Sequence, residues 1–451
     1  MKKSLSKSEY VYIASMLFGM FFGAGNLIFP VYMGQMAGRS MWPALIGFII
    51  TGVGLPLLGV AALGISRSSG LFELSGHIGR PYGYFFTCAL YLTIGPFFAI
   101  PRCATTSFTV GIEQIIPQGS DKLSLYLLLF SLAFFVAALL FSLYPGKIMV
   151  WVGKILNPAF LLFLGILVVV TLVNPGAAIA EVEPAGDYAT VPFFEGFIEG
   201  YNTLDALASL AFGIVVVNVI RGLGVEDGDA VASNTVRAGI FSCLLMAVIY
   251  FFVTLIGVHS RGVIASAENG GVALAQIAKH YLGAPGLIVL AATVTLACLK
   301  TSVGLITSCA ETFAGMFKGL SYRAWAIIFS VVAFGFANFG LSNIISYSLP
   351  LLLFLYPLAI TLILLALFGN LFHHDRAVYV SVTAFTCIAA LFDLAKALPA
   401  NLKTALHLDG AVGLAEKILP FFDISLGWVL PAFVGLVLGL VIHFAKKQKV
   451  A

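Results

Sequence analysis

Long apolar runs separated by short polar segments extend along this chain from one end to the other. The runs have membrane-spanning length, about 20 residues at 1.5 Å rise per residue. They are apolar at consecutive rather than alternate positions, so we expect spanning helices and not the strands of a membrane barrel. The pattern predicts about twelve spans, at 10–33, 42–65, 82–111, 123–143, 148–172, 192–220, 236–258, 286–315, 324–338, 343–368, 377–395 and 425–445.

Composition supports an all-α integral membrane protein. Of 451 residues, 60% are hydrophobic and 10% are charged, whereas a soluble domain carries roughly 25% charged residues. We expect one membrane domain, residues 1–451, embedded in the lipid bilayer, with no cofactor, no nucleic acid and no obligate protein partner. The six cysteines lie inside apolar runs without metal-ligand spacing: Cys88, Cys103, Cys243, Cys298, Cys309 and Cys387.

Basic residues set the predicted orientation, because cytoplasmic loops carry an excess of lysine and arginine. One side holds both termini and 15 of the 24 basic residues, the other side holds seven, and Arg102 and Lys300 lie within spans. We therefore expect cytoplasmic termini. The hydrophilic stretches 221–235, 259–285 and 396–424 are expected to be loops that carry at most a short interfacial helix.

The first span is interrupted by the sequence Gly23-Ala-Gly-Asn-Leu-Ile-Phe-Pro30. Two glycines and an asparagine weaken a helix at mid-membrane, where a break survives only if it lines a polar cavity. We expect free carbonyls near Phe22, which suit a cation, and free amides after Gly25, which suit a carboxylate. Glycines alone would also fit a close helix crossing, but a buried Asn26 needs polar partners and favours a site.

The sixth span is interrupted by Glu199-Gly-Tyr-Asn-Thr-Leu-Asp205. A carboxylate at this depth is a functional-site hypothesis by default; the alternative is that Asp205 pairs with Arg102 or Lys300 for structure alone. Spans one and six are five apart, so a five-span repeat would be inverted, with its two breaks at the binding site. The predicted halves are 10–172 and 192–368, followed by two additional helices at 377–445.

The eighth span carries Cys298, Thr301 and Ser302 at positions i, i+3 and i+4, on one face of one turn. Two hydroxyls and a backbone carbonyl suit a small alkali cation, although Ser and Thr also bond back to their own helix in ordinary membrane spans. Lys300 lies about 100° around the helix from Thr301. It is a candidate fixed counter-charge or proton-exchanging group.

The third span contains two prolines, Pro96 and Pro101, which are expected to kink it just before Arg102. A cation at this position should face protein or water. We therefore treat Arg102 as a candidate gate or as the charge partner of Asp205.

In these residues the chain resembles the branched-chain amino acid:cation symporter family (BrnQ or LIVCS type), essentially end to end. The resemblance is carried by Phe18–Pro30, Gly95–Arg102 and Gly200–Asp205. It implies uptake of leucine, isoleucine and valine with Na⁺ by alternating access across the bacterial cytoplasmic membrane. It also implies the inverted five-helix-repeat (LeuT-type) fold of the amino acid–polyamine–cation superfamily.

The resemblance further implies residue roles. Na⁺ would be bound by the carbonyls of Gly19 and Phe22, the carbonyl of Cys298, and the hydroxyls of Thr301 and Ser302. Asn26 resembles a ligand of a second sodium in the wider fold, but we expect one ion.

The substrate would occupy the two interrupted segments. Its carboxylate would lie on the amides of Ala24, Gly25 and Asn26. Its ammonium would meet carbonyls around Tyr201, Asn202 and Thr203, with Asp205 nearby. Phe97, Leu207 and Phe212 are candidate walls for the branched side chain.

Three alternatives remain open. A proton-coupled carrier of the same fold would give Lys300 or Asp205 the titrating role. A channel would need a continuous polar pore, yet the polar groups cluster at the midplane. An enzyme would need a His/Asp or metal cluster, yet the seven histidines fall at loops or span ends.

Overall fold

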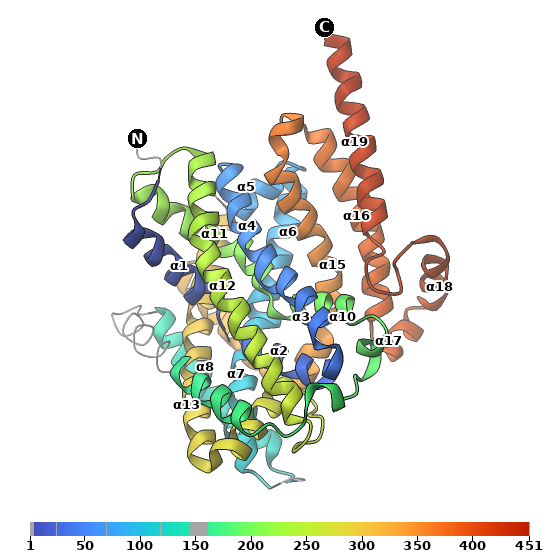
Figure 1. The fold of residues 1–451 in the computed structure, drawn as a ribbon. Helices are drawn as coiled ribbons and strands as arrows, with labels where there is room; N and C mark the ends of the chain where they lie inside the picture. The colour runs from blue at the N-terminus through green and yellow to red at the C-terminus, as the bar shows by residue number, and fades with distance from the viewer. Residues whose placement is uncertain (1–3, 24, 69, 118–119, 144–160, 451) are drawn as a thin grey trace.

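The computed structural model describes residues 4–23, 25–68, 70–117, 120–143 and 161–450. Within these ranges all regular structure is helical and no strand occurs (Figure 1). Each predicted span falls largely on helix, whereas 148–160 and Ala24 lie outside the described residues and the last span begins at Val429 rather than at 425. The helices are α1 (Lys7–Phe21), α2 (Gly25–Ala37), α3 (Met41–Ile49), α4 (Leu55–Ile65), α5 (Leu71–Gly76), α6 (Arg80–Leu92), α7 (Ala99–Val110), α8 (Leu123–Leu143), an apolar helix Leu161–Val173, α10 (Pro192–Glu199), α11 (Asp205–Gly222), α12 (Gly228–Ser260), α13 (Gly270–Met316), α14 (Tyr322–Ala337), α15 (Leu341–Leu367), α16 (Arg376–Ala397), α17 (Ala400–Ala405), α18 (Asp409–Ile418) and α19 (Val429–Val450).

Eight of the described helical segments are long and apolar enough to cross a membrane, and nine if the bent α11 is included. The most apolar window of α15 is 83% buried, whereas those of α8 and α19 are only 28% and 22% buried. Helices that expose so many apolar side chains on the outside of the bundle are expected to face lipid. α15 is therefore a central helix, and α8 and α19 form part of the lipid-facing wall.

The two interruptions predicted from the sequence are present as breaks in the helices. α1 ends at Phe21 and α2 begins at Gly25, and between them the Gly23 amide donates to Asn26 Oδ1 at 2.8 Å. In the sixth span, α10 passes into a 3₁₀ turn at Gly200–Thr203. Leu204 then adopts a left-handed conformation with φ 65°, so α11 restarts at Asp205 in a new direction.

Two other spans contain π-helical turns, at Ile50–Gly54 in the second span and at Thr93–Phe97 in the third. In the third span, Gly95 leaves helical geometry with φ −93° and ψ −122°. The predicted kink is therefore present, at the glycine that precedes Pro96. It separates α6 from α7, which carries Arg102.

α12 and α13 are longer than the sequence pattern predicted. The expected loop at 221–235 is helical from Gly228 onward, because the Asp227 side chain caps the first turn through the amide of Ala230 at 2.9 Å. α13 begins at Gly270 rather than near 286, and bends at Gly283, where φ is 66°. The extension of α12 is polar, and that of α13 is separated from the main apolar run by Gly283 and Pro285, so an apolar-run criterion joins neither to its span.

Some helices of the bundle approach one another backbone to backbone. Figure 1 shows that α1 begins and α19 ends at the same end of the bundle, here called the terminal side. On the opposite side, α2 meets α12 backbone to backbone: a Cβ on Gly34 would overlap the carbonyl of Thr254 and lie 3.1 Å from the Cα of Gly257. A Cβ on Gly196 of α10 would likewise overlap the Ala44 carbonyl of α3. Small residues allow these close approaches.

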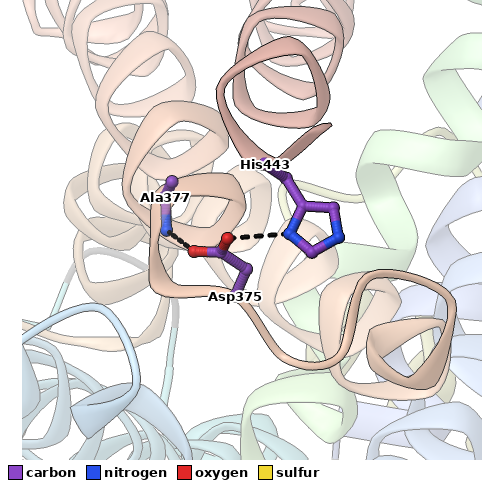
Figure 2. Close-up of polar contacts among 3 residues, drawn as sticks. All are labelled: Asp375, Ala377 and His443. Atoms are coloured by element: carbon purple, nitrogen blue, oxygen red, sulfur yellow. Dashed lines mark hydrogen bonds and ion pairs between the residues drawn. The ribbon is translucent and has the colours of Figure 1, made fainter. Parts of the chain in front are cut away.

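The last helices add a peripheral layer, with α19 packed along α16 (Figure 1). Figure 2 shows how the terminal-side ends of the two are joined: Asp375 caps α16 through the amide of Ala377 at 2.8 Å and accepts a hydrogen bond from His443 of α19 at 2.8 Å. Asp375 precedes the span, and the Ala377 amide, followed by His443, lowers the pKa of its carboxyl.

Candidate substrate site at the two helix breaks

A cavity of about 440 Å³ lies where the two broken spans meet. Ligand pockets have volumes of roughly 300–1,000 Å³. Its lining comes from four spans: Gly19, Phe21, Gly23, Gly25 and Asn26 of the first; Ile94, Ala99, Arg102 and Cys103 of the third; Thr203, Leu204, Asp205, Ala208, Phe212 and Val215 of the sixth; and Lys300, Thr301, Gly304, Leu305, Thr307, Ser308 and Glu311 of α13. Most of this lining is apolar, with a small number of charged groups.

Asn26 and Asp205 connect the two breaks directly. Asn26 Nδ2 donates to Asp205 Oδ2 at 2.5 Å and to the hydroxyl of Tyr250 at 2.5 Å, while its Oδ1 accepts from the Gly23 amide. Asn26 is 2% exposed and Asp205 is 4% exposed. The predicted partners of the buried amide are thus supplied by the sixth span and by α12.

Tyr250 was not predicted as a site residue. Its ring lies edge-on to Phe48 with centroids 5.0 Å apart, and its hydroxyl is 3.5 Å from Asp205 Oδ2. In the sequence it stands within the apolar run 236–258, where a tyrosine resembles any other core aromatic. Only the crossing of α12 over both breaks places its hydroxyl beside Asn26.

Arg102 also contacts both breaks. Its Nη1 donates to the carbonyl of Asn202 at 2.6 Å, and its guanidinium lies 5.0 Å from the centre of the Phe29 ring. A Cβ on Gly25 would stand 3.2 Å from Nη2. Among the described residues, Arg102 and Lys300 make no ion pair with Asp205. A purely structural charge pair, the alternative considered from the sequence, is therefore not the arrangement that this part of the chain adopts.

The residues predicted to hold a cation are only partly gathered at the cavity. Gly19 and Thr301 line it, and the Thr301 hydroxyl lies 3.7 Å from a Cβ position on Gly23. In a continuous helix the Gly23 amide would donate to the Gly19 carbonyl. Here it donates to Asn26 Oδ1 instead, so the Gly19 carbonyl does not receive this hydrogen bond. Phe22 caps α1 with its amide bonded to the Phe18 carbonyl at 2.8 Å.

Ser302 and Cys298 do not line the cavity; both are fully buried beside Cys103 of α7. The Ser302 hydroxyl has no hydrogen-bond partner among the described residues. Buried hydroxyls are normally bonded, so this one has unused hydrogen-bonding capacity. The Thr301 hydroxyl bonds back to Ala297 at 3.1 Å, as many membrane threonines do.

Several predicted residues lie beside the cavity rather than on its surface. The ring of Tyr201 stacks on Tyr356 at a centroid distance of 3.9 Å, and the Asn202 carbonyl accepts a hydrogen bond from Arg102, which lines the cavity. Of the three candidate walls, Phe212 lines the cavity. Phe97 instead packs on Phe336 at 5.1 Å, and Leu207 is fully buried outside the lining. Ala24 lies outside the described residues.

The cavity extends from the breaks toward the terminal side. Its more distant lining comes from the later turns of α11 and α13, ending at the exposed Glu311, which the sequence analysis did not identify. The hydrogen bond from the Tyr10 hydroxyl to Asn234, at 2.6 Å, places the starts of α1 and α12 together on that same side. None of the lining comes from α10 or from α2 beyond Asn26.

Comparison with known proteins identifies the family. Residues 6–446 match the family model described as "Branched-chain amino acid transport protein". The chain belongs to this family. Within the branched-chain amino acid transport family, the "Branched-chain amino acid permease BrnQ" of Lactobacillus delbrueckii subsp. lactis is 53% identical, with 96% of each chain covered. The protein of the same name from Bacillus subtilis (strain 168) is 40% identical over 99% of this chain and 100% of its own.

The solved structures give the fold. Mhp1, described as a nucleobase-cation-symport-1 family transporter in a closed conformation with bromovinylhydantoin bound, superimposes with a TM-score of 0.58 at 16% identity, covering 98% of this chain and 92% of its own. This likeness confirms the predicted LeuT-type, all-helical fold. The family relatives are named permeases, in agreement with the expectation of a transporter rather than an enzyme.

Proposed function

We propose that this protein is a secondary active symporter that imports leucine, isoleucine and valine together with Na⁺ across the bacterial cytoplasmic membrane. The observation that carries the proposal is the mostly apolar cavity in which both helix breaks, Arg102 and Asp205 meet. Such a cavity suits a small molecule with a charged head and an apolar side chain. The names of the family relatives supply the branched-chain substrate class.

In the proposed mechanism the substrate head group lies between the two breaks. The carboxylate approaches the free amides at the start of α2, Gly25 and Asn26, in the first predicted half. The ammonium approaches Asp205 and the carbonyls of the 3₁₀ turn that ends at Thr203, in the predicted inverted second half. The branched side chain lies against Phe212 and Leu305.

Na⁺ is proposed to bind between α1 and α13. The end of α1 supplies carbonyls, and Thr301 faces the same break. If Na⁺ binds more tightly when the cavity is open to the outside, it shifts the population toward that state, which is how coupling arises. One charge moved across 100 mV contributes about 2.3 kcal/mol to uptake.

With the termini on the cytoplasmic side, as the basic residues predict, the described conformation is open toward the cytoplasm. The close packing of α2 on α12 and of α10 on α3 lies on the outer side. Alternating access then requires an outward-open state in which the terminal-side halves, α1 and α11, close over the cavity.

Reconstituted vesicles test the proposal. Purified protein should accumulate labelled leucine when a Na⁺ gradient is imposed at fixed pH, with isoleucine and valine as competitors. Thr301→Ala combined with Ser302→Ala should abolish the Na⁺ stimulation while leaving exchange of preloaded leucine measurable. Sodium-stimulated uptake that is unchanged in the double variant would show that the cation site is wrongly placed.

A proton-coupled carrier is the second candidate. It is favoured by Lys300, which lines the cavity and makes no hydrogen bond or ion pair within the described parts of the chain. A pH jump at constant Na⁺ distinguishes the two. Uptake driven by protons and lost in Lys300→Gln would assign the coupling to this side chain.

A further inference from the structure

Two buried opposite charges line the cavity without touching one another. Arg102 is 5% exposed and Asp205 is 4% exposed, and both contribute to the cavity surface. Their nitrogen and oxygen atoms are more than the 4.0 Å of an ion pair apart in the described structure. Isolated charges are costly to bury, and a buried pair is normally retained by direct contact. Holding the two apart leaves room for a ligand that carries both complementary charges.

The surroundings of Arg102 select an anion. A guanidinium carries five N–H donors, of which Nη1 has one hydrogen bond, to the Asn202 carbonyl. Nη2 stands beside Gly25, the first residue of α2, whose free amides carry partial positive charge. A guanidinium and a helix start repel one another unless an anion lies between them. A carboxylate fits best, because it accepts two parallel hydrogen bonds from arginine.

The surroundings of Asp205 select a cation. The hydrogen bonds from Asn26 and Tyr250 both reach Oδ2. Oδ1 accepts none of the hydrogen bonds found among the described residues. Asp205 also starts α11, and its own amide bonds to Thr203 Oγ1 at 3.3 Å, which fixes the carboxylate at the break. One oxygen is thus held in place by the protein, and the other is left for a donor such as an ammonium group.

We propose that Arg102 and Asp205 together are the receptor for the zwitterionic head of an α-amino acid, Arg102 binding the carboxylate and Asp205 the ammonium. The proposal rests on the proposed function and changes the role of Arg102 from gate to substrate ligand. It also explains the position of the apolar lining. With the head group fixed at the breaks, the substrate side chain is directed toward Phe212 and Leu305.

The unmodified protein provides the first test, by competition against labelled leucine in reconstituted vesicles. Leucinamide lacks the carboxylate, and 4-methylpentanoate lacks the ammonium. Each would leave one buried charge without its partner, so each should bind about 10- to 100-fold more weakly than leucine. Binding of either analogue within about twofold of leucine would overturn the proposal.

Variants then assign each charge to its residue. In Arg102→Gln, leucine affinity should fall about 10- to 100-fold while leucinamide affinity changes little, so that the preference for a carboxylate disappears. Asp205→Asn should remove the preference over 4-methylpentanoate instead. Lys300→Gln removes the other cation of the lining and should preserve both preferences when they are measured by equilibrium binding, which does not depend on coupling. If Lys300→Gln rather than Arg102→Gln removes the carboxylate preference, the assignment is wrong.

Further measurements distinguish a failure of the proposal from a purely structural role of Arg102 and from a failure of the proposed function. Arg102→Lys retains a charge but not the two-pronged geometry, so leucine affinity should fall between those of the wild-type protein and Arg102→Gln. An equal loss of leucine and leucinamide binding in both variants would indicate a structural role and overturn the proposal. If the wild-type protein binds a different α-amino acid but no branched one, the proposed function fails and the receptor stands. If it binds no amino acid, both fail.

Discussion

Removing the hydroxyl of Tyr250 tests whether the cluster at the two breaks positions Asp205. In Tyr250→Phe the ring and its edge-on contact with Phe48 are retained. The change removes the bonds of that hydroxyl to Asn26 at 2.5 Å and to Asp205 at 3.5 Å. Asn26 keeps its bond to Asp205, but its second N–H loses its acceptor inside a buried site.

The expected magnitude follows from these contacts. An unsatisfied buried donor costs about 1–3 kcal/mol, and the long contact to Asp205 adds little. We therefore expect a loss of about 1–2 kcal/mol, equivalent to about a 5- to 30-fold rise in the leucine concentration for half-maximal uptake. The maximal rate should change less, because no group that contacts the apolar side chain is altered.

Tyr356→Phe is the matched control for this measurement. Tyr356 is also fully buried and stacks on Tyr201, but its hydroxyl has no hydrogen-bond partner in the described structure. Its removal should leave leucine uptake within about twofold of the wild-type value. Equal effects of the two substitutions, or an unchanged half-saturation in Tyr250→Phe, would refute the view that the Tyr250 hydroxyl holds the cluster.

Three further predictions concern stability in detergent, measured as the apparent melting temperature. Gly34→Ala should lower it, because the new methyl overlaps the Thr254 carbonyl and overpacking costs about 1–3 kcal/mol; Gly335→Ala, with no atom within 4 Å of its Cβ, should be neutral or slightly stabilising. Asp375→Asn should lower the melting temperature near neutral pH. A carboxyl with a lowered pKa stabilises the fold above its ordinary pKa of 3.8, and this stabilisation is lost as the pH falls through the lowered pKa. A difference in melting temperature from the wild-type protein that persists at the lowest pH would contradict this. Asp393→Asn should raise stability, since both oxygens of this buried carboxylate lack a hydrogen-bond partner in the described structure; a clear fall would reveal an essential charge.

Features that depend on local sequence were predictable. The spans follow from continuous apolar runs, and both breaks follow from polar residues and glycines placed where lipid tolerates neither, at Gly23–Asn26 and Tyr201–Asp205. Helix ends beyond the apolar region were not predictable in this way. The first turns of α12 are polar and are fixed by the Asp227 cap, which a hydropathy pattern does not register.

Features that depend on how helices pack, and therefore on where side chains point, were not predictable from the sequence. Arg102 could be recognised as unusual, but its bond to the Asn202 carbonyl instead of a pairing with Asp205 depends on how α7 meets the sixth span. Phe97 was expected at the substrate wall, yet the non-helical Gly95 just before it redirects the chain, and the ring packs on Phe336. One kinked residue is enough to change which face of a helix borders a cavity.

The position of Arg102 bears on how binding and conformational change are linked. A transported ligand shifts the equilibrium between two states only through contacts that differ between them. Arg102 contacts the first broken span through Phe29 and Gly25, and the sixth through Asn202. A carboxylate bound to this guanidinium therefore interacts with a group whose position depends on both breaks at once. Asp205 has the same property through its bond to Asn26. A substrate held between these two charges, as proposed, would respond to any relative movement of α2 and α11, which is the requirement for coupling its occupancy to alternating access.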